Sequence, residues 1–397
     1  MKRVPLGARP DWREKAEAAG FAFHTMHGEP YWDEASAYAF TLAEVEDGIE
    51  DPSTALHAMC REAVAQIVAS EELMERLGIP APHMDLVAGS WTAGEPELYG
   101  RMDLAFGTGG PAKLLEYNAD TPTSLYESAS FQWDWLEDML AVGRLPGGAD
   151  QFNGVFEALT ARLGELFSAG TDLHFAAFRD SPEDYATVET MAYAAREAGL
   201  GAHFVNLSDI ALSTEGQFLD GEDRVIGALF KLYPWEDMLR DDFADRIADA
   251  GCRILEPAWK AVVSNKGLLP VLWRMFEGHP NLLPAFFEDE LTSGDPLVER
   301  ARAALERGHV RKPIFSREGA GVTITEGGRV VEASANTAYD GHPAVVQAYA
   351  ELPLMDGVRP VVGAWIVGES CVGMGLREDR SRITEDLSRF KPHYIEA

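Results

Sequence analysis

The chain has 397 residues, of which 34 are lysine or arginine and 65 are aspartate or glutamate, so its formal net charge is −31. A surface this acidic argues against nucleic acid and anionic membranes as partners, and an anionic ligand would need a local basic pocket. The length predicts about two or three domains or one large composite unit.

The three cysteines, Cys60, Cys252 and Cys371, lie far apart in the sequence. Their spacing predicts neither a disulfide framework nor a cysteine-rich zinc site. Met1 is not followed by an apolar signal segment, and no stretch of about 18 apolar residues occurs. We therefore expect a cytoplasmic protein with no membrane partner.

The first part of the chain, from about Asp11 to Leu77, is predicted to be mostly helical. Apolar residues such as Leu42, Val45 and Ile49 recur there at helical spacing. The run Pro80-Ala81-Pro82 is expected to end this block.

The next two predicted strands carry the most informative motifs of the sequence, Tyr-Gly-Arg-Met-Asp and Lys-Leu-Leu-Glu-Tyr-Asn. At strand periodicity Arg101 and Asp103 share a face, and so do Glu116 and Asn118. Three oxygen ligands and one guanidinium in a single cleft suit Mg²⁺ and the phosphate oxygens that it bridges. The alternative is a solvated edge strand, where such alternation is common. The run Asn-Ala-Asp-Thr-Pro-Thr-Ser that follows favours a site at the end of the strand.

A helix is predicted from Ser124 to Leu140, with its aromatic residues in the core or an interface. The segment 143–150 is typical of a linker. Beyond it, strand 173–178, helix 181–199 and strand 202–207 form a βαβ-like unit without a G-x-G-x-x-G loop, which we interpret as a scaffold.

The last part of the chain is predicted to contain strands at 225–230, 322–324, 344–349, 361–367 and 371–376. A helix opens at Ser264-Asn265-Lys266-Gly267. Two lysines here, Lys266 and Lys312, stand at element boundaries beside turn or proline residues, where they suit contacts with anions. Together with Arg101, Arg317 and Arg377 they are candidates for the basic pocket. A surface position remains the alternative for each lysine alone.

At these motifs the sequence resembles the synthetase part of the glutathionylspermidine synthase family. The resemblance rests on Tyr-Gly-Arg-Met-Asp, on Lys-Leu-Leu-Glu-Tyr-Asn-Ala-Asp-Thr-Pro-Thr-Ser, on Asn265-Lys266 with its following Leu-Pro-x-Leu-Trp, and on Lys312-Pro313-Ile314. The opening Arg-Pro-Asp-Trp-Arg-Glu-Lys and Gly-Glu-Pro-Tyr-Trp are similar to stand-alone relatives of the acid–amine ligase type. The resemblance covers nearly the whole chain.

The resemblance implies an α/β (α+β) fold, a permuted ATP-grasp with a pre-ATP-grasp, Rossmann-like βαβ domain. It implies three units. Residues 1–145 would hold the helical region and the metal-site strands, 146–255 the pre-ATP-grasp-like domain, and 256–397 the ATP-grasp domain with its lid loop.

The resemblance also implies residue roles. Asp103, Glu116 and Asn118 would hold Mg²⁺, while Arg101 would meet ATP and the transferred phosphoryl group or the acyl phosphate. Arg101 would therefore act both in ATP binding and in catalysis.

Further ATP contacts are implied for Lys266, Lys312, Gln347 and the backbone through Leu352, the last two on the adenine side. Gly319 would lie in a mobile loop over the phosphates.

Arg317 lies in the same loop and would be a catalytic residue. Arg377 would also be catalytic and would lie near the reacting phosphate. Thr121 and Thr123 match hydroxyl positions near the acid substrate, with a helix cap as the alternative. Glu183 falls in an acid-rich substrate motif.

Two departures from the family pattern limit which activities and substrates the resemblance implies. The chain begins directly with the synthetase part, so we expect no amidase activity. Pro182 stands where the family has an acidic residue, which argues against glutathione and spermidine as the substrates.

The sequence therefore predicts an ATP- and Mg²⁺-dependent ligase that joins a small-molecule acid to an amine through an acyl phosphate. A carboxylate is a poor acyl donor, so ATP must supply a better leaving group, and fixed positive charge stabilises the transition states. Two alternatives remain open, a non-catalytic nucleotide-binding regulator and a small-molecule phosphotransferase.

Overall fold

The structure, a computed structural model, describes residues 1–26, 28–385 and 387–397. It is a mixed α/β molecule, and the strands of these residues form two five-stranded sheets, one four-stranded parallel sheet and three smaller sheets. None of the helices in the described ranges is long and apolar enough to cross a membrane.

The central sheet brings the predicted site strands together with the end of the chain. Its order is β20-β19-β18-β5-β6, and all neighbours are antiparallel. The strands are β5 (Tyr99–Ala105), β6 (Lys113–Asn118), β18 (Arg359–Val367), β19 (Ser370–Asp379) and β20 (Arg389–Lys391). One sheet thus joins the first and third of the expected units, and the division at 145 and 255 stays a prediction.

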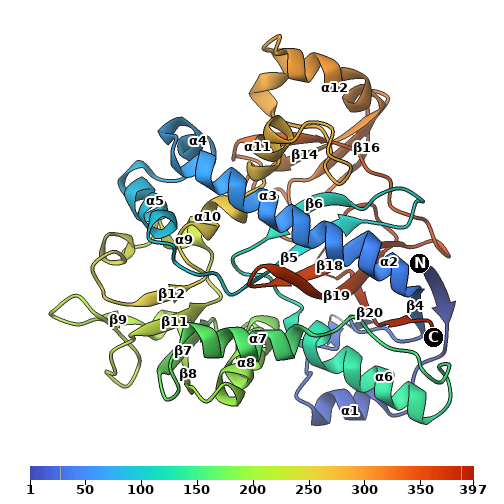
Figure 1. Cartoon of the computed structure of the whole chain (residues 1–397), viewed down its shortest axis with the longest axis horizontal. Coiled ribbons are helices and arrows are strands. Elements are labelled where there is room, and N and C mark those ends of the chain that lie inside the picture. The colour runs from blue at the N-terminus through green and yellow to red at the C-terminus, as the bar shows by residue number, and fades with distance from the viewer. Residues whose placement is uncertain (27, 386) are drawn as a thin grey trace.

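Helix α3 (Asp51–Val68) runs across one side of this sheet (Figure 1). A π-helical turn (Glu46–Glu50) leads into this helix without a break, and Pro52, which has no N–H to donate, stands just after that turn. The apolar residues Leu56, Val64 and Ile67 of α3 are buried in the core at helical spacing. The helix packs on β18 and β19 and so covers the face of the central sheet opposite to the polar residues described below.

The βαβ-like unit is confirmed as a parallel sheet of order β12-β11-β7-β8 with helices packed on it. The elements are α7 (Val155–Leu166), β7 (Asp172–Ala177), α8 (Pro182–Glu197), β8 (Gly201–Asn206), β11 (Ala228–Lys231) and β12 (Arg253–Leu255). Small hairpin strands lie beside it, β9 (Ala211–Leu212) and β10 (Phe218–Leu219).

The second five-stranded sheet has the order β13-β17-β14-β15-β16 and is antiparallel. Its strands are β13 (Ala285–Phe287), β14 (Gly308–Pro313), β15 (Thr323–Glu326), β16 (Arg329–Ala333) and β17 (Ala344–Ala348). Its helices are α11 (Leu268–Met275) and α12 (Pro296–Arg307), at the top of Figure 1.

The N-terminal part is mostly helical between Asp11 and Leu77, as predicted, but it also contains strands that were not predicted. It contains β1 (Lys2–Pro5), β2 (Thr25–Met26), β3 (Glu29–Pro30) and β4 (Ser36–Phe40) beside the helices α1 (Trp12–Ala18), α2 (Leu42–Val45), α4 (Glu71–Arg76) and α5 (Met84–Thr92). Strand β4 pairs with β1 and with the last strand, β21 (His393–Ile395). The two chain ends consequently lie near each other (Figure 1).

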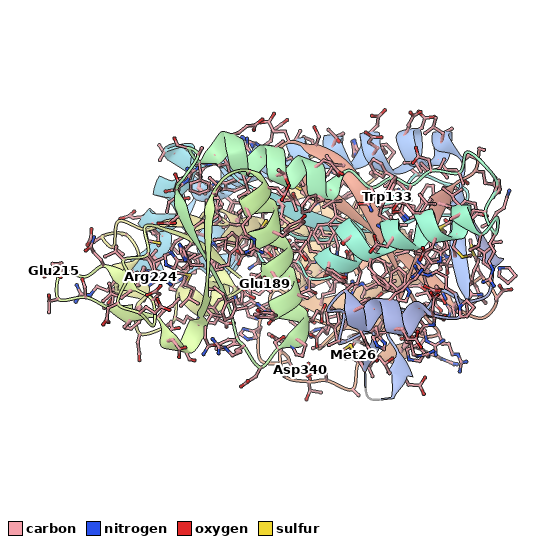
Figure 2. The ribbon with its side chains drawn as sticks, turned by 90° about the horizontal axis from the view of Figure 1, so that it is seen from below. Met26, Trp133, Glu189, Glu215, Arg224 and Asp340 are labelled. Carbon is pink, nitrogen blue, oxygen red and sulfur yellow. The ribbon has the colours of Figure 1, made fainter. Side chains whose placement is uncertain are left out.

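The helix predicted after Ser124 consists of a π-helical turn (Glu127–Phe131) and α6 (Gln132–Ala141). Phe131, Trp135 and Leu136 are buried as expected, but Trp133 is 38% exposed on the outer side of α6. Figure 2 shows Trp133 there and the hairpin around Glu215 projecting at one end of the molecule. Of two short helices, α9 (Trp235–Met238) lies between β11 and β12 in the chain, and α10 (Lys260–Val263) follows β12.

Candidate active site

The polar residues of β5 and β6 share one face of the central sheet, as the sequence predicts. The register pairs Arg101 with Asn118 and Asp103 with Glu116. Carboxylates directly opposite each other on neighbouring strands repel, so this pair needs positive charge nearby. The alternative of a solvated edge is wrong for β5, because β5 lies inside the sheet and Asp103 is only 4% exposed.

Three cations surround the two carboxylates. Arg101 donates from Nε to Oδ1 of Asp103 at 2.8 Å, and Arg377 from β19 donates from Nη2 to Oδ2 at 2.9 Å. Lys266, just before α11, places its Nζ 3.0 Å from Oε2 of Glu116. Residues from β5, from β19 and from the loop before α11 thus meet at one point.

The ionised form of Glu116 is strongly favoured. Burial opposes ionisation, but the charges of Lys266 and Lys312 and a hydrogen bond from Asn118 outweigh it and hold the pKa of Glu116 below its usual value. The Asn118 amide donates to Oε1 of Glu116 at 3.1 Å. The carboxylate is therefore available as an anionic oxygen ligand at neutral pH.

Lys312 and Gln347 connect the second sheet to the backbone of β6. Lys312 donates from Nζ to the Gln347 amide oxygen and to the Leu115 carbonyl, both at 2.9 Å, and Gln347 donates to the Leu114 carbonyl at 2.9 Å. Burial lowers the pKa of Lys312 to about 8, with the help of Lys266 and against the charge of Glu116. An anion bound beside Lys312 would therefore stabilise its ammonium form.

A loop between β14 and β15 borders the same space. Arg317 donates to Oε1 of Glu236 in α9 at 3.2 Å. Gly319 has a φ of +69°, and a Cβ there would lie 2.5 Å from Cγ2 of Ile383 and 2.8 Å from the Thr384 carbonyl. Only glycine lets this loop approach the 383–384 segment so closely.

All residues predicted for the site line one cleft of about 720 Å³. They are Arg101, Asp103, Glu116, Asn118, Thr121, Thr123, Glu183, Lys266, Lys312, Arg317, Gly319, Gln347, Leu352 and Arg377. The structure brings them together from both five-stranded sheets and from α8.

The two threonines lie in the loop after β6. The Thr123 carbonyl accepts a hydrogen bond from Nη1 of Arg101 at 2.7 Å. The helical segment that follows begins at Leu125, so the position before it belongs to Ser124 and to neither threonine. Glu183 stands in the first turn of α8, whose cap Ser181 accepts from the Asp184 N–H.

The cleft residues that were not predicted from the sequence include Glu236 and Arg382. Glu236 belongs to a Tyr-Pro-Trp-Glu turn, and only its placement opposite Arg317 in the fold reveals its position. Arg382 follows Arg377 by five residues, but the end of β19 separates them and no local pattern links the two.

The donor set suits a hard cation. Two carboxylates and one amide oxygen are the ligand types that Mg²⁺ prefers. Among the described residues no cluster of three or more histidine, cysteine, aspartate or glutamate side chains is placed to hold a metal. Any ion here would therefore depend on Asn118 and on oxygens of a bound ligand, and Mg²⁺ commonly binds this way with substrate phosphates.

None of the three cysteines lines the cleft. Cys60 and Cys371 are buried, and burial raises the pKa of Cys252 and of Cys371 to about 12. A thiolate nucleophile is thus disfavoured at neutral pH. The cleft offers charge and positioning instead.

Comparisons with known proteins find relatives over nearly the whole chain. The family model described as "Glutathionylspermidine synthase preATP-grasp" matches residues 3–396. A Haemophilus influenzae protein named "Putative acid--amine ligase" is 39% identical over 408 residues, which cover 100% of both chains.

Longer relatives match as well. Trypanothione synthetase of Crithidia fasciculata is 28% identical, with 83% of this chain and 52% of the relative covered. The bifunctional glutathionylspermidine synthetase/amidase of Escherichia coli is 24% identical, with 96% of this chain and 63% of the relative covered. The chain therefore spans about half to two thirds of these two relatives.

Among solved structures, the glutathione synthetase-like effector of Globodera pallida in its apo form superposes with a TM-score of 0.56 at 11% identity, and the match covers 99% of each chain. This likeness concerns the fold alone, and together with the family match it confirms the expected ATP-grasp-type α/β fold. The motifs, the match over residues 3–396 and the full-length relative at 39% identity lead to one conclusion: the chain belongs to the glutathionylspermidine synthase preATP-grasp family.

Proposed function

We propose that the chain is an ATP- and Mg²⁺-dependent ligase that joins a carboxylic acid to an amine through an acyl phosphate. The observation that carries the proposal is the pair Asp103 and Glu116, which lines one cleft with two buried lysines, Lys312 on β14 of the other sheet and Lys266 just before α11. The names of the family and of its relatives, all synthetases or ligases, support the same reaction class.

The residues divide the cleft by function. Asp103, Glu116 and Asn118 would hold Mg²⁺, which when bound neutralises phosphate oxygens. Lys266 and Lys312 would contact the phosphates of ATP, and Gln347 with the backbone through Leu352 would contact the adenine side. These assignments are the ones that the family resemblance implies, and the common cleft of the residues supports them.

Arginines would act on the reacting atoms. In the first step a substrate carboxylate oxygen attacks the γ-phosphorus of ATP and ADP leaves, and Arg101 and Arg377 balance the charge on the transferred phosphoryl group. In the second step the amine nitrogen attacks the acyl carbon, inorganic phosphate leaves and the nitrogen loses a proton. Arg317 and Gly319 would close the cleft against water, which otherwise hydrolyses the acyl phosphate.

The substrates would bind at the α8 end of the cleft. Thr121 and Thr123 would contact the acid, and the carboxylate of Glu183 suits the amine before it reacts. We propose small molecules as both substrates, with no nucleic-acid or membrane partner. The cytoplasmic location expected from the cysteine content stays a prediction.

A substrate screen tests the proposal. Purified chain with Mg²⁺·ATP is incubated with pooled acids and amines, and ADP release is measured together with new amide masses. ADP that appears only with an acid and an amine, accompanied by an amide mass, supports a ligase. A stable phosphorylated product without amine would instead show a phosphotransferase, and nucleotide binding without ADP in any pool would favour a regulator.

A further inference from the structure

A row of four residues crosses the central sheet at the candidate metal site. The register aligns Glu116 on β6, Asp103 on β5, Gly363 on β18 and Gly375 on β19. The two carboxylates are thus followed by two positions without a side chain. Neither glycine has a positive φ that would require glycine for backbone reasons.

The space over Gly363 is taken by Arg101. A Cβ at Gly363 would lie 2.8 Å from Cδ of Arg101 and 3.3 Å from its Cγ and Nε. From this position the Arg101 guanidinium reaches both oxygens of Asp103, at 2.8 and 3.3 Å, and the Thr123 carbonyl at 2.7 Å. The neighbouring Trp365 ring, 5.9 Å from the Arg101 Cζ, is fully buried.

We propose that Gly363 is a positioning residue of the cleft, because its missing side chain lets Arg101 lie across β18 and face the phosphoryl group. The part of this inference that concerns phosphate rests on the proposed function. A Cβ closer than 3.0 Å to Arg101 cannot be accommodated in place, and Trp365 and Asp103 border the arginine. The guanidinium must therefore move, and groups that act on a reacting phosphate tolerate only small displacements.

Gly375 provides a matched control in the same row. A Cβ there would lie 2.6 Å from Oγ of Ser128 and 2.8 Å from the Phe390 ring. Both residues belong to the packing between the sheet, the π-helical turn and β20. Gly375→Ala should therefore lower stability without a selective effect on Arg101.

The experiment compares Gly363→Ala, Gly375→Ala, Arg101→Ala and the double variant Arg101→Ala/Gly363→Ala. Mg²⁺ complexes of ADP and of AMP-PNP, as the ATP analogue, are titrated by calorimetry, and urea midpoints are measured. We expect Gly363→Ala to lose at least about tenfold of the preference for AMP-PNP over ADP while its urea midpoint is kept. In the Arg101→Ala background the same change should add nothing, since the arginine that it displaces is gone.

Two outcomes would overturn the inference. One is an unchanged nucleotide preference in Gly363→Ala, and the other is an equal loss from Gly363→Ala in the Arg101→Ala background. If Gly363→Ala does not fold, truncation of Arg101 should restore folding, and an unfolded double variant contradicts the inference.

A crystal structure of Gly363→Ala separates this inference from the proposed function. It should show the Arg101 guanidinium displaced from Asp103, even if the wild-type chain binds no nucleotide. Failure of the wild-type chain to bind AMP-PNP would remove the proposed function alone. An Arg101–Asp103 pair that stays intact in the variant would remove the role of Gly363 alone.

Discussion

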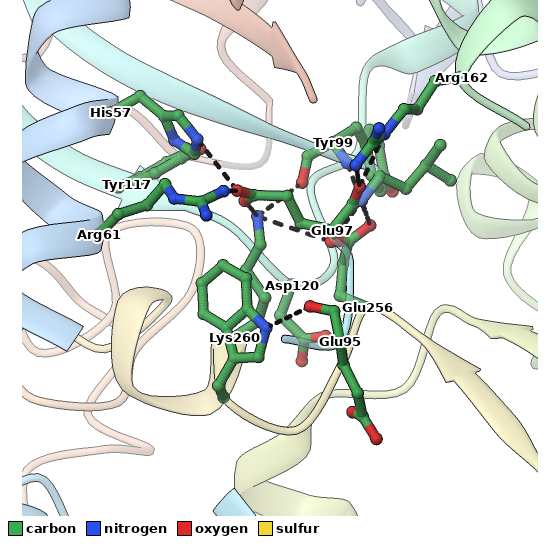
Figure 3. A network of polar contacts seen from close by, with 12 residues as sticks. His57, Arg61, Glu95, Glu97, Tyr99, Tyr117, Asp120, Arg162, Glu256 and Lys260 are labelled. Carbon is green, nitrogen blue, oxygen red and sulfur yellow. Dashed lines mark hydrogen bonds and ion pairs between the residues drawn. The ribbon is translucent and has the colours of Figure 1, made fainter. Parts of the chain in front are cut away.

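The two sides of strands β5 and β6 carry ionic clusters of similar composition and very different access. Behind the strands, Lys260 lies 2.7 Å from Glu97 and 3.5 Å from Glu256, and His57 joins Glu97 to the Tyr117 hydroxyl (Figure 3). All five of these side chains are almost fully buried.

The cluster on the cleft side is open at its centre. The Glu116 side chain is 26% exposed and that of Arg377 20%, and both border the cleft. Their partners come from separate elements and can exchange for a ligand. The buried network has no such space, and its Glu256 carboxylate is bound by the N–H groups of Leu98 and Tyr99 at the start of β5.

A cluster of charged residues alone therefore does not identify a ligand-binding site. Burial opposes ionisation of Glu97, yet Lys260 and His57 hold its pKa below the usual value. Burial raises the pKa of Glu256 to about 7, although Lys260 acts in the opposite direction. The contacts that cause these shifts hold β5 in place, whereas Glu116 and Lys312, whose pKa values are also shifted, face the cleft.

The largest effect on stability is expected from Lys260→Met. The change leaves the buried Glu256 without its cation and leaves Glu97 with Arg61, 2.7 Å away, and removal of one partner from a buried ion pair costs about 3–5 kcal/mol. Urea denaturation measures the loss. Lys2→Met, which removes an exposed pair with Glu396, is the control and should change the unfolding free energy by less than about 1 kcal/mol. A small effect at Lys260 would contradict the structural role of the buried network.

The next effect concerns activity. Glu116→Gln and Asp103→Asn should lower Mg²⁺-dependent ADP formation by about 10²- to 10³-fold, since each removes an anionic ligand beside the phosphates. The urea midpoint of Glu116→Gln should stay close to that of the wild type, whereas Asp103→Asn weakens the buried pair with Arg101 and should lower its midpoint while the fold is kept. Glu288→Gln, which alters an exposed pair with Arg311 outside the cleft, should leave both unchanged. Undiminished ADP formation in both cleft variants would remove the assigned metal site.

A smaller effect is expected from pH. Lys312 has a lowered pKa of about 8, so its ammonium form is present below that pH and is lost as the pH rises through it. Bound ATP favours the charged form of Lys312, so the affinity for ATP should fall above pH 8 by up to about tenfold per pH unit. Above that pH, Lys312 should take up a proton when ATP binds. Calorimetry in buffers of different ionisation enthalpy measures the uptake. Lys312→Arg stays charged and should abolish the slope, whereas a slope that persists would assign it to another group.

The smallest change in stability is expected from Arg317→Ala. Its pair with Glu236 is partly exposed, and such pairs contribute about 0–1 kcal/mol. If the loop acts on the phosphates, ADP formation should fall while the thermal midpoint hardly moves. Glu236→Gln removes the same pair and keeps the arginine, so its activity should remain near that of the wild type. Equal losses in both variants would indicate that the pair itself is needed.

The cleft was predictable because strand periodicity places Arg101, Asp103, Glu116 and Asn118 on one face and because the motifs are specific. The βαβ-like unit was predictable for a similar reason, since its elements are local and periodic.

The pairing of strands that lie far apart in the sequence could not be predicted. On the side away from β6, strand β5 pairs with β18, which follows more than 250 residues later in the chain. Only that pairing brings Gly363 under Arg101. Strand β4 was missed because all its residues are buried, so it shows no alternation. A short apolar run of this kind does not distinguish helix from strand.

The most direct test is a crystal structure with Mn²⁺ and AMP-PNP, in which anomalous scattering locates the metal. We predict a peak within coordination distance of Asp103, Glu116 and Asn118, with the phosphates toward Lys266 and Lys312. A nucleotide bound outside this cleft, or a metal peak that touches none of the three ligands, would contradict the account.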